Sequence, residues 1–222
     1  MSRCASIWAA MAVAIAAAPA IARKPPPCPP PGPQLFLSPM GEPFRAGPGQ
    51  PYPVATWFAR ADADSDSRLS PAEMIADADR FFATLDTDHD GEIIPEEMSR
   101  YEREVAPEIR LYVAGRQTGP REERRSRGNK PEPYGAPLGA GRFAFLNLPQ
   151  PVSAADDDLN RGVSREEFRK AAADRFRQID RTSLGYLIIA NLPLTPVQQL
   201  AANCTPPDPG RPPERPNRPR RP

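Results

Sequence analysis

The sequence predicts a mainly α-helical protein made of two similar helix–loop–helix pairs with Pro-rich, disordered tails. Three observations predict this class. Twelve-residue acidic or formerly acidic segments recur four times, and in each half of the chain the second begins 24 residues after the first (62 to 86, 156 to 180). Apolar residues fall at the same offsets from every segment, and proline is concentrated in the tails. Internal duplication of a two-loop unit explains the first two observations.

Residues 1–22 have the pattern of an export signal. The basic residue Arg3 precedes an apolar run over 7–18, and a small-x-small cleavage pattern ends at Ala22. We expect this signal peptide to be removed, which makes the mature protein periplasmic or secreted and leaves no transmembrane segment. The alternative is a short membrane anchor, but the run is shorter than the roughly 20 apolar residues that a spanning helix needs.

Export would leave two cysteines, Cys28 and Cys204, in an oxidising compartment. A disulfide between them would close a loop of about 176 residues, which stabilises by at most roughly 5 kcal/mol on the chain-entropy model. Two unpaired thiols in the tails are the alternative, and the sequence leaves both open.

Composition divides the chain into two helix-rich blocks separated and flanked by segments of low core content. Residues 25–33 contain seven prolines and residues 206–222 contain eight, so both should be extended. Residues 50–110 carry 15 acidic and 6 basic side chains, so acidic charge is concentrated where the first repeats lie. The expected organisation is a signal peptide (1–22), a Pro-rich N-terminal segment (23–50), a first helix–loop–helix pair (51–114), an Arg/Pro/Gly linker (115–149), a second pair (150–204) and a Pro/Arg-rich tail (205–222).

Loop 1 (residues 62–73) and loop 2 (residues 86–97) share one arrangement of oxygen-bearing side chains. Aspartates stand at positions 1, 3 and 5, and a glutamate stands at position 12. Alternating aspartates can turn three carboxylates inward and the glutamate can add both its oxygens, which suits a hard cation such as Ca²⁺. Gly91 permits a sharp turn at position 6 of loop 2, whereas Ser67 should adopt it in loop 1 at some cost in backbone strain.

These loops resemble the calcium-binding loop of the EF-hand family, and the resemblance covers residues 52–113. It implies Ca²⁺ as the ligand and helices on both sides of each loop, but it leaves the physiological role open. In this pattern position 7 offers its main-chain carbonyl, and a polar side chain at position 9 can hold a water, which Ser70 supplies and Ile94 does not. The implied metal ligands are Asp62, Asp64, Asp66, Arg68, Ser70 and Glu73 in loop 1, and Asp86, Asp88, Asp90, Glu92 and Glu97 in loop 2.

Two further copies of the pattern depart from it by different amounts. Loop 3 (residues 156–167) has Arg161 at position 6, which brings a positive charge beside the site, and its segment 158–168 is similar to one in exported bacterial EF-hand proteins. Loop 4 (residues 180–191) has Leu184 at position 5 and Asn191 at position 12, so we expect a degenerate fourth hand without calcium. The ligands implied for loop 3 are Asp156, Asp158, Asn160, Gly162 and Glu167.

Apolar residues at three fixed offsets indicate that all four copies fold alike. Four residues before each loop stand Phe58, Phe82, Val152 and Phe176; position 8 is Leu69, Ile93, Val163 or Leu187; and the residue after position 12 is Met74, Met98, Phe168 or Leu192. Loop 4 keeps these residues although it lost its ligands, as expected for a hand retained for packing.

The distance between loops predicts how they pair. Residues 74–85 and 168–179 contain neither Gly nor Pro, so one continuous helix should leave each odd-numbered loop and enter the next. Such a helix holds its two loops roughly 18 Å apart. We therefore expect crosswise pairing of loop 1 with loop 4 and of loop 2 with loop 3. Capping boxes at Ser70, Ser164 and Thr195 predict where three helices start.

The sequence thus predicts an exported calcium-binding protein that acts as a Ca²⁺ buffer or as a Ca²⁺-dependent binding module. The alternative is an envelope protein whose tail at 205–222 binds an anionic polymer or a partner, with calcium only structural. An enzyme is a minor alternative, because GxSxG, phosphate-binding and His/Cys motifs are missing and the sole histidine, His89, lies at a variable loop position. Nucleic acid is not expected as a partner, because the basic runs lack interleaved aromatic residues.

Overall fold

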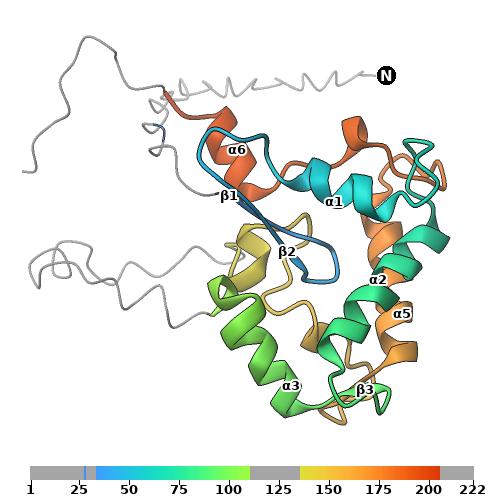
Figure 1. The fold of residues 1–222 in the computed structure, drawn as a ribbon. Helices are drawn as coiled ribbons and strands as arrows, with labels where there is room; N and C mark the ends of the chain where they lie inside the picture. Colours follow the sequence, from blue (N-terminus) through green and yellow to red (C-terminus); the bar gives the residue numbers. More distant parts are fainter. Residues whose placement is uncertain (1–27, 29–33, 111–135, 206–222) are drawn as a thin grey trace, which may run out of the picture.

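The computed structural model describes Cys28, residues 34–110 and residues 136–205. The predicted signal peptide, most of the Pro-rich run at 25–33, much of the linker and the tail from residue 206 lie outside these residues. The described part is a mixed fold of five α-helices and two small antiparallel sheets (Figure 1). None of its helices is long and apolar enough to cross a membrane. In chain order it contains β1 (Gln34–Leu37), β2 (Pro43–Ala46), α1 (Val54–Ala61), α2 (Pro71–Leu85), β3 (Glu92–Ile93), α3 (Pro95–Arg100), β4 (Val163–Ser164), α5 (Arg165–Ile179) and α6 (Pro196–Ala202).

The long helices α2 and α5 each connect two acidic loops without a break, as predicted. Each starts at a capping serine, since Ser70 accepts a hydrogen bond from the Glu73 amide and Ser164 accepts one from the Glu167 amide. The two helices lie side by side (Figure 1). Their inner faces meet through aromatic rings, with the centroids of Phe82 and Phe168 5.6 Å apart.

The crosswise pairing of the loops is confirmed. Leu69 of loop 1 and Leu187 of loop 4 exchange both main-chain hydrogen bonds, at 2.8 and 2.9 Å. Strand β3 of loop 2 pairs with β4 of loop 3, with Ile93 opposite Val163. All four position-8 residues are at most 4% exposed, so the two pairings lie at the edge of one shared core.

The flanks of loops 3 and 4 are less helical than predicted. Loop 3 is preceded by the single 3₁₀ turn Ser153–Ala155, and loop 4 ends in the 3₁₀ turn Ile189–Asn191. Prolines explain both, because Pro149 and Pro151 precede the first turn and Pro193 follows the second, and proline cannot donate a helical hydrogen bond. Val152 is nevertheless buried, whereas Leu192 is half-buried.

Within the segment 23–50, which the sequence analysis describes only as Pro-rich, residues 34–46 contribute to the core. These form the β1–β2 hairpin, whose residues Phe36, Leu37 and Met40 are at most 1% exposed. Phe36 lies with its ring centroid 4.9 Å from Phe145 and 5.5 Å from Trp57. The apolar side chains outweigh the local proline content, because the prolines sit at the turn and at a strand start, where a missing amide is tolerated.

The prediction that residues 115–149 form a linker outside the core is wrong for residues 136–149. Ala140 and Ala144 are buried, and Gly139–Arg142 form a 3₁₀ turn. A Cβ on Gly139 would lie 2.3 Å from the Pro149 carbonyl oxygen, and its φ is +52°. The glycines that suggested a loose linker therefore permit close packing of the backbone.

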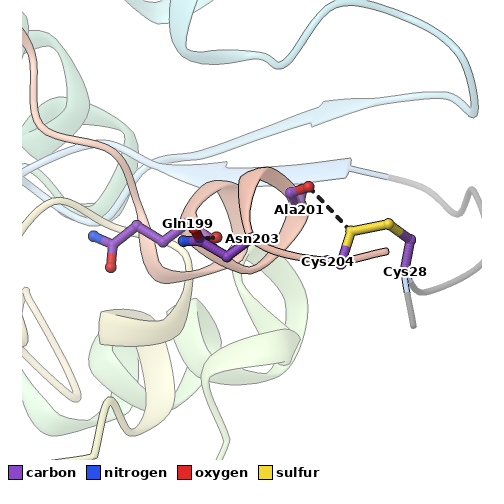
Figure 2. The surroundings of a disulfide bond; sticks show 5 residues. All are labelled: Cys28, Gln199, Ala201, Asn203 and Cys204. Atoms are coloured by element: carbon purple, nitrogen blue, oxygen red, sulfur yellow. Dashed lines mark hydrogen bonds between the residues drawn. A yellow bond between two sulfur atoms is a disulfide. The ribbon is translucent and has the colours of Figure 1, made fainter. Parts of the chain in front are cut away.

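The described ends of the chain are joined by the disulfide Cys28–Cys204, which spans 176 residues of sequence (Figure 2). The Cys28 amide also donates a hydrogen bond to the Thr205 carbonyl, at 2.9 Å. Cys204 follows α6, which starts at the predicted capping residue Thr195. Of the two alternatives that the sequence left open, the structure has the disulfide.

Candidate metal centre

Loops 1, 2 and 3 each gather three carboxylates around one point. In each group the three side chains offer oxygen atoms that lie within 4.8 Å of one another. The position-12 glutamate belongs to the groups in loops 2 and 3, whereas the group in loop 1 consists of its first three aspartates. The groups are Asp62, Asp64 and Asp66; Asp86, Asp88 and Glu97; and Asp156, Asp158 and Glu167. Among the described residues, loop 4 contributes no such group.

All four loops share one backbone conformation, which sequence alone suggested only at position 6. Positions 4 and 6 of every loop have φ between +53° and +92°, the left-handed region that favours glycine. Glycine occupies only two of these eight positions. The residues are Ser65, His89, Leu159 and Ser183 at position 4, and Ser67, Gly91, Arg161 and Gly185 at position 6. This pair of left-handed residues wraps the chain, and in loops 1, 2 and 3 the carboxylates at positions 1 and 3 converge.

Main-chain amides orient the carboxylates within each loop. The position-1 aspartate accepts from the position-6 amide, for example Gly91 to Asp86 at 3.2 Å and Arg161 to Asp156 at 3.0 Å. In loops 1, 2 and 3 the side chains at positions 3 and 5 accept hydrogen bonds from the main-chain amides two residues further along. The Gly162 amide, for example, donates to Asn160 at 2.7 Å. These hydrogen bonds restrict the rotamers of the side chains that accept them.

The position-12 glutamates close the loops. Glu97 is 6% exposed and accepts hydrogen bonds from the Thr87 amide and hydroxyl and from the Ile94 amide. Burial raises the pKa of Glu97, but these hydrogen bonds outweigh it and hold the pKa below its ordinary value. Hydrogen bonds from Ser70 lower the pKa of Glu73 in the same way, against a smaller effect of burial. Each glutamate is therefore held as an anion.

Two buried oxygens test whether a metal fits these loops. Asp86 Oδ1 and Asp156 Oδ1 are buried, and no described residue donates a hydrogen bond to either. Leaving such an oxygen unsatisfied costs free energy, more so for a charged group. Both atoms belong to position 1 of a carboxylate group, and Asp86 is only 1% exposed. An oxygen-only donor set with an unsatisfied oxygen fits a hard divalent cation, and the loop residues present would hold it.

The remaining predicted ligands have mixed surroundings. Asp90 and Asn160 occupy position 5 and are exposed. The Ser70 hydroxyl serves as the α2 cap and donates to Glu73 at 2.8 Å, so its oxygen is already engaged. The backbone of Arg68, Glu92 and Gly162 lies at position 7, next to the position-8 pairing.

Sequence reasoning missed contacts that cross between loops. Arg165, the first residue of α5, places its Nη2 3.9 Å from Asp86 Oδ2 of loop 2. Glu92 of loop 2 lies over Gly162 of loop 3, where an added Cβ would meet Glu92 Oε1 at 1.6 Å. Gly162, at position 7 of loop 3, therefore lies against the Glu92 side chain of the facing loop. No pattern within one loop could have revealed either contact.

Loop 4 keeps the loop conformation without the carboxylate group. Asp180 accepts from the amides of Gly185 (2.8 Å) and Leu184 (3.2 Å) and from the hydroxyl of Thr182 (3.1 Å). Its pKa lies below the ordinary value, chiefly because of the hydrogen bond from the Gly185 amide. Donors within loop 4 thus satisfy its position-1 carboxylate.

Comparison with known proteins adds no assignment: no protein-family model, no curated protein and no solved structure matches this chain.

Proposed function

We propose that this chain is an exported calcium-binding protein of the EF-hand type. Loops 1, 2 and 3 bind Ca²⁺, and loop 4 is a degenerate hand retained as the packing partner of loop 1. The observation that carries the proposal is Asp86, which belongs to a convergent carboxylate group and whose buried Oδ1 has no donor among the described residues. The repeat spacing of 24 residues, the left-handed backbone at positions 4 and 6 and the crosswise pairing of the loops support it.

The proposal assigns roles to individual residues. The carboxylates at positions 1 and 3 and the position-12 glutamate bind the cation, and the main-chain amides keep them oriented before it arrives. A bound Ca²⁺ supplies positive charge that offsets repulsion within the carboxylate group. Because these groups are preorganised by hydrogen bonds, metal uptake should stiffen the loops more than it rearranges them.

Calorimetric titration of the mature protein with Ca²⁺ tests this directly. We expect three equivalents, or two if Arg161 keeps loop 3 empty, and one fewer in Glu73→Gln or in Glu97→Gln, because each loses a carboxylate of one loop. Glu96→Gln is the matched control, since this exposed neighbour of Glu97 carries the same charge outside the groups. A folded protein that takes up no Ca²⁺ at millimolar concentration would refute the proposal.

A second measurement separates a buffer from a Ca²⁺-dependent binding module. Met74 is 1% exposed and Met98 is half-buried, so a module must expose apolar surface when it binds Ca²⁺. Fluorescence of an apolar dye should then rise on calcium addition. Equal fluorescence with Ca²⁺ and with a chelator would exclude the binding module and favour the buffer.

A further inference from the structure

Arg165 brings a positive charge from one loop to a carboxylate of another. It stands at position 10 of loop 3, and its amide donates to the Gly91 carbonyl of loop 2 at 3.2 Å. Its Nη2 lies 3.9 Å from Asp86 Oδ2, and its guanidinium carbon lies 4.8 Å from the ring centroid of Phe82. One backbone contact and one stacking contact therefore hold the guanidinium beside loop 2.

The carboxylate that Arg165 approaches is the deepest one in the three groups. Asp86 is 1% exposed, its Oδ2 already accepts from the Gly91 amide, and its Oδ1 has no donor among the described residues. The guanidinium thus approaches the oxygen that is already engaged and not the unpartnered Oδ1. A cation bound by loop 2 would therefore contact Asp86 together with the positive charge of Arg165.

The other loops offer no such charge at the same position. Position 10 is Pro71 in loop 1, Pro95 in loop 2 and Ile189 in loop 4, none of which is charged. An Arg in loop 3 acts on loop 2 because β3 and β4 are paired. The arrangement distinguishes the loop 2 site from the site in loop 1.

We propose that Arg165 is an affinity-determining residue of the loop 2 metal site and weakens its binding of Ca²⁺. The guanidinium partly neutralises Asp86 before the metal arrives, and it repels the metal once bound. Because the side chain is 37% exposed, solvent and salt reduce this repulsion without abolishing it. The inference rests on the proposed function, since it concerns the affinity of one of its sites.

The test is a Ca²⁺ titration of full-length mature protein followed by ¹H–¹⁵N spectra. The Gly91 resonance reports on loop 2, because its amide donates to Asp86, and the Gly162 resonance follows loop 3 separately through its hydrogen bond to Asn160. We expect Arg165→Gln to raise the affinity at loop 2 about three- to tenfold at low ionic strength, and by less at high salt. Arg169→Gln is the matched control, since it removes the same charge from α5 at a residue paired with Asp79 of α2 rather than with a loop carboxylate. The Ca²⁺ affinity of this variant at loop 2 should stay within about twofold of wild type.

A conservative variant separates charge from structure. Arg165→Lys keeps the positive charge and should bind Ca²⁺ nearly as the wild type does, whereas a purely structural role would weaken binding in both Arg165 variants. Equal affinities in Arg165→Gln and Arg169→Gln, or weaker binding in Arg165→Gln, would overturn the inference. If wild-type Gly91 does not respond to Ca²⁺ at all, the metal site of loop 2 fails instead.

Discussion

Loops 2 and 3 form one pair, and loops 1 and 4 form the other. The two pairs have the same backbone conformation, but the oxygens of their position-1 aspartates are engaged differently. In the first pair, the position-1 aspartates Asp86 and Asp156 each keep one buried oxygen without a described donor. In the second pair, Asp180 of loop 4 satisfies itself with two amides and a hydroxyl. Two-residue strands join the first pair, and a single bridge between Leu69 and Leu187 joins the second.

This difference teaches that the loop conformation does not depend on metal ligands. Loop 4 keeps left-handed backbone at Ser183 and Gly185 although its carboxylate group is gone. Local hydrogen bonds and the buried residue at position 8 are sufficient to hold it. A loop of this kind can therefore serve as a packing element without a carboxylate group.

The largest effect should come from breaking the pairing itself. Ile93 is 0% exposed and Leu187 is 4% exposed, so Ile93→Ala and Leu187→Ala should each cost about 2–4 kcal/mol in the free energy of unfolding. Their effects on metal should differ: Ile93→Ala should weaken Ca²⁺ binding in loops 2 and 3, and Leu187→Ala in loop 1 only. Denaturant unfolding and calorimetry measure the two effects.

The control for both variants is Ile189→Ala, because Ile189 is 47% exposed and should change stability by less than about 1 kcal/mol. If Ile93→Ala weakens all three sites equally, the two pairs are one cooperative unit and the distinction between them is wrong.

The next effect concerns calcium-dependent stability. At Ca²⁺ concentrations a hundredfold above the dissociation constant, one site should stabilise the protein by about 2.7 kcal/mol. Asp86→Asn should lose that gain for loop 2, because it removes a buried carboxylate ligand. Asp180→Asn should lower stability equally with Ca²⁺ and with a chelator, because Asp180 holds amides rather than metal. Thermal unfolding under both conditions distinguishes them, and a calcium-dependent loss in Asp180→Asn would contradict the role given to loop 4.

The pairing could be predicted because it follows from short-range facts. Twelve residues without Gly or Pro between loops require a single helix, and a helix of that length separates its own loops. The capping serines Ser70 and Ser164 mark the starts of these helices in the sequence itself. Local signals of this kind predict α2, α5 and where the four loops lie in the sequence.

The rest could not be predicted because it depends on distant neighbours. The β1–β2 hairpin is stabilised by Trp57 and Phe145, which lie far from it in sequence. The contact between Arg165 and Asp86 joins two halves of the duplication and exists only once β3 meets β4. The proline content of residues 23–50 gives no sign of the hairpin at 34–46, because composition does not reveal which apolar residues find a partner.

The smallest effect tests whether backbone strain accounts for the difference between the pairs. Each pair has one loop with glycine at position 6 and one without, with φ +67° at Ser67 and +81° at Arg161. Strain of roughly 1–2 kcal/mol at such a residue is partly offset by the greater chain entropy of glycine. Ser67→Gly and Arg161→Gly should therefore each stabilise the protein by up to about 1 kcal/mol, measured by denaturant unfolding. Ser99→Gly in the helix α3 is the control and should destabilise by about 0.5–1 kcal/mol. Similar gains in the two loops would show that strain is shared evenly between the pairs, so that their difference lies in the oxygens. A gain confined to one loop would instead make backbone strain part of that difference.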